Sequence, residues 1–79
     1  MKQVQQPLNV TTDAQGNPSR LEGPRRPVAV RRVLDAWRYG GRWWVGESPR
    51  DYFLLELETG HVFEVYRVEE QWVLSRVAD

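Results

Sequence analysis

The sequence contains no cysteine and a single histidine, His61. The absence of cysteine excludes disulfide bonds, thiolate zinc sites and cysteine nucleophiles, so a catalytic or metal-binding site would have to be built around His61. This histidine follows directly on a Thr59-Gly60 turn, where an exposed polar side chain is the ordinary occupant. The six glycines are scattered over turns and form no phosphate-binding loop. We therefore expect a protein that is not an enzyme and that has no metal site and no cofactor.

Long apolar runs and a net charge are also missing. The longest uncharged apolar run is far shorter than the ~20 residues that a membrane span needs. The first residues are not followed by the apolar stretch of a signal peptide. These absences predict a soluble, cytoplasmic protein without a membrane partner. Eleven basic side chains balance eleven acidic ones, so the total charge alone indicates no partner.

The chain of 79 residues is long enough for one domain and too short for two. Four tryptophans, three tyrosines and two phenylalanines can supply its core. A domain of this size buries only roughly 60–65% of its unfolded surface. Because no disulfide supports the chain, stability has to come from aromatic packing or from self-association, and a homodimer joined by edge strands or aromatic patches is one expectation.

The first 25 residues are expected to form an N-terminal hairpin in front of a core of residues 26–79. Leu8 and Val10 alternate with polar residues, and the nearby Pro7 is typical of an edge strand. Residues 13–18 concentrate turn formers, after which the chain would return as a second strand.

Residues 28–39 fit two periodicities. Val30 and Leu34 belong to a pattern with helical spacing, and the same two residues belong to a pattern that alternates as in a strand. The Gly40-Gly41 pair between two aromatic-rich runs is typical of a hairpin. We therefore favour a long strand with a bulge at Arg31-Arg32, while a helix remains the alternative.

The remaining segments predict further short strands. Residues 41–45 are expected to form one, and residues 52–58, 61–68 and 71–77 a meander with two-residue turns. With the earlier segments this makes about six strands. We predict an all-β fold, either a small, strongly bent antiparallel sheet or an SH3-like half-barrel, in which few strand edges stay exposed.

The neutral total charge conceals an asymmetry along the chain. Residues 1–50 hold nine basic and four acidic side chains, whereas residues 51–79 hold two and seven. The basic half runs into two adjacent tryptophans. Arginine forks that grip phosphates, beside aromatic rings on which bases stack, are what a β-surface uses to bind single-stranded nucleic acid. The candidate binding residues of this Arg/Trp face are Arg26, Arg31, Arg32, Arg38, Arg42, Trp43 and Trp44.

A second interpretation assigns the same arginines to ion pairs. Cross-strand pairs of opposite charge are common in sheets, and tryptophans are needed mostly for burial. The carboxylates available for such pairs are those of Glu56, Glu58, Glu64, Glu69 and Glu70. The two interpretations differ in whether residues 28–38 and 51–68 are neighbours, so that their charges cancel locally, or leave a basic patch.

Two motifs resemble a known family. The segments VLDAW at residues 33–37 and RWWVGESPR at residues 42–50 resemble the bacterial domain family DUF6504 and a C-terminal segment of some ImuB-type proteins. The ImuB-type proteins are homologues of Y-family translesion polymerases and act in a complex with a replicative-type polymerase. The similarity covers roughly residues 26–79 and carries over no catalytic residue.

This resemblance implies a role in DNA damage tolerance or replication. We therefore expect a small accessory module that docks on a protein partner of a replication or repair complex. The alternative is a single-stranded nucleic-acid-binding β domain that uses the Arg/Trp face.

Overall fold

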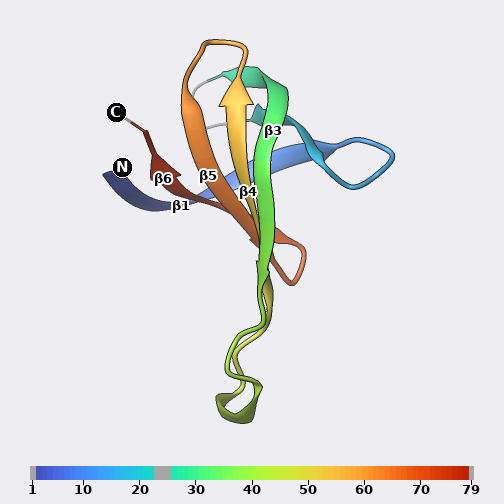
Figure 1. The fold of residues 1–79 in the computed structure, drawn as a ribbon, viewed down its shortest axis with the longest axis vertical. Coiled ribbons are helices and arrows are strands. Elements are labelled where there is room, and N and C mark those ends of the chain that lie inside the picture. The colour runs from blue at the N-terminus through green and yellow to red at the C-terminus, as the bar shows by residue number, and fades with distance from the viewer. Residues whose placement is uncertain (1, 23–25, 79) are drawn as a thin grey trace.

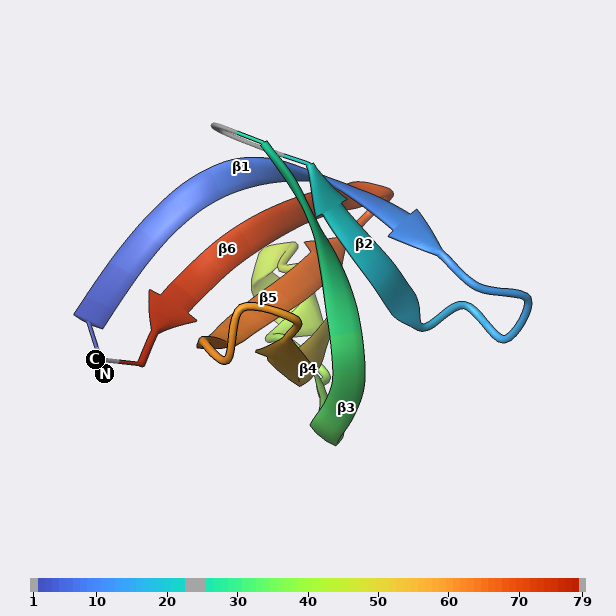
Figure 2. The ribbon, with the colours of Figure 1, turned by 90° about the horizontal axis from the view of Figure 1, so that it is seen from above.

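The computed structural model describes residues 2–22 and 26–78, so residues 23–25, where the predicted N-terminal hairpin ends, lie outside the described residues. The elements are β1 (Lys2–Thr12), β2 (Pro18–Glu22), β3 (Pro27–Tyr39), the short 3-10 helix η1 (Trp43–Val45), β4 (Arg50–Leu57), β5 (Val62–Val68) and β6 (Gln71–Val77). Each strand pairs antiparallel with the next and β6 pairs with β1, which closes a small barrel (Figures 1 and 2). The predicted all-β class and the predicted number of strands are confirmed.

β1 closes the barrel because its two halves pair with different strands. Residues 2–8 pair with β6, and residues 9–12 pair with β2. Each half of β1 has one paired neighbour, so the other side of the strand carries no ladder. Such a position tolerates Pro7, because the backbone N–H that proline lacks is not needed there. Lys2 lies opposite Val77, so the start of β1 and the end of β6 are side by side (Figure 1).

β3 is a strand over its full length of 13 residues, and the helical alternative is wrong. Its register with β4 shifts between Val30 and Arg32, where the bulge was predicted, and again between Val33 and Asp35. Each bulge inserts one extra residue and changes which face the following side chains occupy. The second bulge leaves Leu34 43% exposed, while Val33 packs against the core.

The core lies inside the barrel and is built from alternate residues of its strands. Leu55 and Leu57 of β4 and Val65 of β5 are fully buried. Leu21 of β2 and Leu74 of β6 complete the cluster, so the N-terminal hairpin contributes to the same core as the meander. Alternation along β4 places apolar side chains inward, as the sequence pattern predicts.

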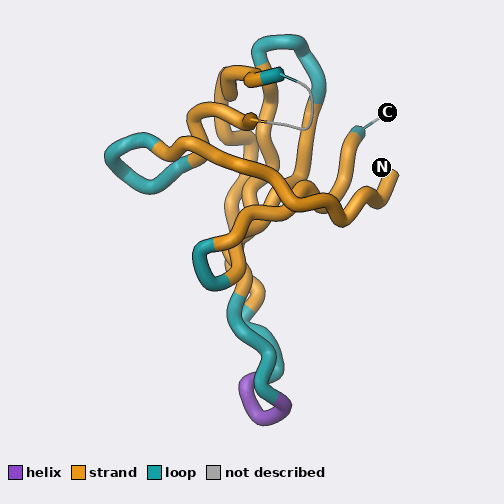
Figure 3. The backbone as a smooth tube through the Cα atoms, turned by 180° about the vertical axis from the view of Figure 1, so that it is seen from behind, coloured by secondary structure: helices purple, strands orange, loops and turns teal. Residues whose placement is uncertain are grey.

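The β3–β4 hairpin extends away from the barrel and ends in a compact turn (Figures 1 and 3). The prediction of a strand at residues 41–45 is wrong, because η1 occupies this segment. The backbone amide of Val45 donates to the carbonyl of Arg42 at 3.0 Å, and that of Gly46 donates to the carbonyl of Trp43 at 3.1 Å. The chain reverses direction here, and the turn satisfies its backbone groups locally. No helix in the described part of the chain is long and apolar enough to cross a membrane.

Candidate functional site

The basic and acidic halves of the sequence are neighbours in the barrel. β3 pairs with β4 from Val30 to Tyr39, and this register sets arginines of β3 beside carboxylates in and just after β4. The pairs are Arg31 with Glu58 at 3.8 Å, Arg32 with Glu56, and Arg38 with Asp51 at 3.6 Å. Arg31 also donates to the backbone carbonyl of Glu58 at 3.2 Å. Three arginines of the basic half are therefore paired with carboxylates of the acidic half, as the second interpretation predicts.

The arginines of the Arg/Trp face do not lie on one surface. Glu56 and Asp51 are separated by an odd number of positions on β4, whose register with β5 is unbroken between them, so their side chains point to opposite faces. Arg32 and Arg38 pair with these carboxylates and therefore lie on opposite faces as well. Arg26 is exposed and precedes β3, at the far end of that strand from η1.

Three of the predicted residues, Arg42, Trp43 and Trp44, do come together at the tip of the hairpin. The exposed fractions are 79% for Trp43, 65% for Trp44 and 60% for Val45. The two indole rings form an edge-to-face pair with centroids 5.9 Å apart. The interpretation that tryptophans fill the core is wrong for these two; Trp72, in contrast, packs against the core.

An ion pair that we call the Arg42–Glu47 clamp holds the tip. Arg42 donates to Glu47 Oε2 from Nη2 at 2.7 Å and from Nε at 3.2 Å, and its backbone amide donates to Oε1 at 2.9 Å. Hydrogen bonds from the guanidinium, and next from the backbone amide, hold the pKa of the Glu47 carboxyl at about 2. The side-chain bonds to Glu47 in turn raise the pKa of Arg42.

Two further contacts order the loop behind the clamp. The Ser48 hydroxyl donates to a carboxylate oxygen of Glu69, in the β5–β6 turn, at 2.6 Å. Gly41 has φ +75, and a Cβ there would lie 3.0 Å from the carbonyl oxygen of Ser48. These contacts and the clamp hold the loop residues on both sides of the exposed tryptophans.

A second group of candidate side chains lies on one face of β3, β4 and β5. Trp37, Tyr52 and Tyr66 are cross-strand neighbours in the register. Ring centroids are 5.3 Å apart for Trp37 and Tyr52, which are parallel to within 4°, and 5.1 Å apart for Tyr52 and Tyr66. In the next row Arg50 lies opposite Tyr39, and its guanidinium is 4.7 Å from the centre of the Tyr66 ring.

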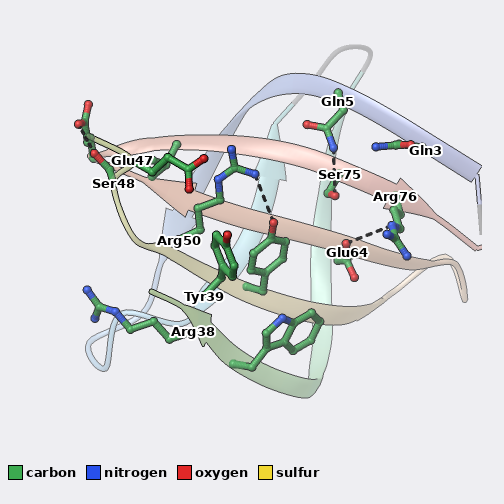
Figure 4. A pocket seen from close by; sticks show the side chains of 14 residues that line it. Gln3, Gln5, Arg38, Tyr39, Glu47, Ser48, Arg50, Glu64, Ser75 and Arg76 are labelled. Carbon is green, nitrogen blue, oxygen red and sulfur yellow. Dashed lines mark hydrogen bonds and ion pairs between the residues drawn. The ribbon is translucent and has the colours of Figure 1, made fainter. Parts of the chain in front are cut away.

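Trp37 and Tyr52 of this aromatic row line a hollow of about 820 Å³ (Figure 4). Gln5 of β1 and Ser75 of β6 line its other side. The Tyr66 hydroxyl donates to Gln5 Oε1 at 3.1 Å, and Gln5 Nε2 donates to Ser75 Oγ at 3.4 Å. Gln5 has φ +56, in the left-handed region that costs a non-glycine residue about 1–2 kcal/mol. It sits where the register of β1 with β6 shifts, and the bulge turns its amide into the hollow (Figure 4).

The aromatic row was missed at the level of the sequence. Trp37 and Tyr39 are two positions apart, as are Arg50 and Tyr52, so each pair shares one face of its strand. That spacing is the available signal. The spacing alone does not show that the two strands are neighbours, so the site can be recognised only when the register between them is known.

Comparison with protein-family models, with curated proteins and with solved structures finds no match. Among the residues that the structure describes, no three or more His, Asp or Glu side chains are grouped so as to hold a metal ion. His61 is exposed, and its Nδ1 lies 3.0 Å from the Thr59 hydroxyl oxygen.

Proposed function

We propose that the chain is a small non-enzymatic accessory module that docks on a protein partner through the tip of the β3–β4 hairpin. The observation that carries this proposal is the exposure of Trp43, Trp44 and Val45 on a projecting, ordered turn. Single exposed apolar side chains are ordinary on a protein surface. Three adjacent ones, two of them tryptophan, are typical of an interaction site.

The surroundings of the tip favour a protein partner over nucleic acid at this position. The Arg42 guanidinium is engaged twice by Glu47, whose pKa of about 2 keeps the carboxylate charged. A phosphate would have to compete with this carboxylate, and with those that pair with the arginines of β3. Insertion of the two indoles into an apolar cleft on a partner protein does not require any arginine to give up its carboxylate. Binding of single-stranded nucleic acid by the Arg/Trp face, the alternative function, has weaker support for this reason.

The size of the tip indicates a transient contact. A tryptophan that is fully covered buries about 150–250 Å². The two indoles can therefore contribute roughly 300–400 Å² to the surface that this chain buries in the interface. A standard interface buries about 800 Å² on each partner. We therefore expect the tip to insert into an apolar cleft of the partner with a dissociation constant in roughly the micromolar range.

The free side of β3 is protected against pairing with another strand. Beyond Ala29, the described register gives β3 one neighbour, β4. Bulges at Arg31 and Leu34 and the charges of Arg32 and Arg38 are features that keep edge strands from pairing. A homodimer, which stays a prediction, would therefore use the aromatic surface of the tip in place of this edge.

The resemblance to DUF6504 and to the ImuB-type segment supports a partner in DNA damage tolerance or replication. The tip itself lies within one of the two motifs that carry the resemblance. The first partners to test are therefore an ImuB-type protein and the replicative-type polymerase of the same complex.

The experiment measures binding of these purified proteins to the wild-type chain and to a Trp43→Ser, Trp44→Ser double variant. Leu34→Ser is the matched control, because it removes an exposed apolar side chain from the same hairpin away from the tip. We expect the double variant to lose roughly 30-fold in affinity and the control to bind as the wild type does.

Equal binding by the double variant would contradict docking through the tip. Partition of the wild-type chain into phospholipid vesicles through Trp43 and Trp44, without binding to protein, would contradict a protein partner. Absence of binding to both candidate proteins would remove the assignment to damage tolerance.

A further inference from the structure

The hollow beside the aromatic row is lined by Arg50, a cation that forms no ion pair with a carboxylate of the described residues. Within the described residues, every other arginine of β3 to β6 lies within 4.0 Å of a carboxylate oxygen, and Arg50 does not. The hydrogen bond that its guanidinium makes there is a long one, from Nη1 to the Tyr52 hydroxyl at 3.4 Å. A guanidinium carries five N–H donors. Most of the donors of Arg50 are therefore available to a ligand.

Arg50 has three tyrosines as neighbours on its face of the sheet. Tyr39 lies opposite on β3, Tyr52 lies two positions further along β4, and the guanidinium is 4.7 Å from the centre of the Tyr66 ring. The bond to the Tyr52 hydroxyl raises the pKa of Arg50, which keeps it protonated. A cation held against aromatic rings is less screened by water than one on an open surface, so it attracts an anion more strongly.

The carboxylates that line the hollow already have partners. Glu47 belongs to the Arg42–Glu47 clamp, and Glu69 accepts a hydrogen bond from Ser48. Glu64 is nearly buried and lies 3.6 Å from Arg76 (Figure 4). An anion that enters the hollow therefore finds Arg50 as the cation without a bound carboxylate.

An exposed indole lies diagonally across the strands from this cation. Trp37 is 40% exposed and stacks on Tyr52, the neighbour of Arg50 on the same face of β4. Diagonal neighbours in an antiparallel sheet are about 7–8 Å apart. A nucleotide has this arrangement, because its sugar separates an aromatic base from a phosphate.

We propose that the hollow binds a nucleoside phosphate, with the phosphate on Arg50 and the base stacked on Trp37. The amides of Gln3 and Gln5 line the opposite side, where a base or sugar can accept or donate hydrogen bonds (Figure 4). A free nucleotide and a unit of single-stranded DNA offer the same chemistry. The site goes beyond the docking function. It differs from the Arg/Trp face in its cation and its stacking ring, although Arg38 of that face also lines the hollow.

The test uses fluorescence anisotropy of a labelled oligothymidylate, with unlabelled thymidine monophosphate, thymidine and inorganic phosphate as competitors. We expect the oligonucleotide to bind at low salt and more weakly at high salt. Thymidine monophosphate should compete, and thymidine and inorganic phosphate should compete at least about tenfold less well. Arg50→Gln should weaken binding roughly 10- to 100-fold.

Arg32→Gln is the matched control, since it removes an exposed arginine from the same pair of strands outside the hollow, and it should change binding less than about threefold. Arg50→Lys keeps the positive charge but lacks the planar donors of the guanidinium, and it should give an intermediate loss of affinity. This variant replaces Arg50→Gln if Arg50→Gln does not fold. The Trp43→Ser, Trp44→Ser variant should bind the oligonucleotide as the wild type does, which separates this site from the docking tip.

The proposal is overturned if neither oligonucleotide nor monophosphate binds at low salt. Equal losses in Arg50→Gln and Arg32→Gln, or competition by inorganic phosphate as strong as that by the nucleotide, overturn it as well. Binding of the oligonucleotide with competition by the free monophosphate supports the site in both forms of the ligand. Binding of the oligonucleotide alone supports a unit of single-stranded DNA as the ligand.

Discussion

Two leucines of the β3–β4 hairpin differ in burial, and replacing each with alanine tests the arrangement of the barrel. Leu55 is fully buried between Val33 on β3 and Phe63 on β5, whereas Leu34 lies on a bulge and is 43% exposed. Buried leucine-to-alanine changes cost about 2.7–5.0 kcal/mol, and the cost is higher where neighbours cannot collapse into the cavity. Hydrogen-bonded strands on both sides restrict such collapse at Leu55. We expect Leu55→Ala to cost about 3–5 kcal/mol and Leu34→Ala about 1 kcal/mol or less.

The difference is large compared with the whole stability of the domain. A chain of this length is stabilised by roughly 4–12 kcal/mol, so Leu55→Ala should lower Tm by roughly 15–30 °C. Urea unfolding followed by far-UV circular dichroism and by tryptophan fluorescence measures both variants. Equal costs, or a larger cost at Leu34, would contradict the bulged register of β3, because an alternation from Val30 onwards without either bulge would place Leu34 in the core with Val30.

Two further predictions concern the support of the tip. The pKa of Glu47 in the folded chain, about 2, lies below its ordinary value of 4.5, so the contribution of the clamp to stability is complete above about pH 4.5 and is lost as the pH falls towards 2. A carboxyl ¹³C titration of Glu47 should show this low midpoint, and a midpoint near 4.5 would contradict the clamp. Gly41→Ala should destabilise the chain by about 1–3 kcal/mol in urea unfolding, because its φ is positive and its Cβ would press on the Ser48 carbonyl. Gly40→Ala, where a Cβ meets nothing within 4 Å, should change stability by less than about 0.5 kcal/mol, and equal effects at the two glycines would count against the packing of the loop.

Local patterns were enough to predict most of the strands. The alternation of Phe53, Leu55 and Leu57 is visible in the sequence, because side chains of one strand segregate by face without reference to other strands. The turn at Thr59-Gly60 is also local, since Gly60 supplies the positive φ that the turn requires. The bulge at Arg31 was predictable because two consecutive arginines interrupt an apolar alternation.

The tip could not be predicted in the same way. Tryptophan and valine favour strands because they fit a half-buried, pleated surface. At the end of a projecting hairpin that surface is missing, and residues 43–45 form a 3-10 turn with their side chains exposed. Strand propensity therefore gave the wrong structure for the segment with the strongest functional signal.

The hollow depends on long-range register, which single-strand patterns do not contain. Trp37, Tyr52 and Tyr66 meet because two bulges in β3 and an unbroken β4–β5 ladder bring them into one row. Gln5 reaches the hollow through a backbone with positive φ. The sequence gives no sign of this conformation, because glycine and asparagine are the residues that usually adopt it. The charge asymmetry was visible from the sequence, but whether it cancels depended on β3 and β4 being neighbours.

The most direct test of docking through the tip is a ¹H–¹⁵N spectrum of the four tryptophan indoles during titration with a purified ImuB-type partner. The account predicts that the signals of Trp43 and Trp44 shift or broaden. The signal of Trp72, which packs against the core beside Phe53, should stay unchanged. A titration in which the partner binds while Trp43 and Trp44 keep their signals, and Trp37 or Trp72 changes, would contradict it.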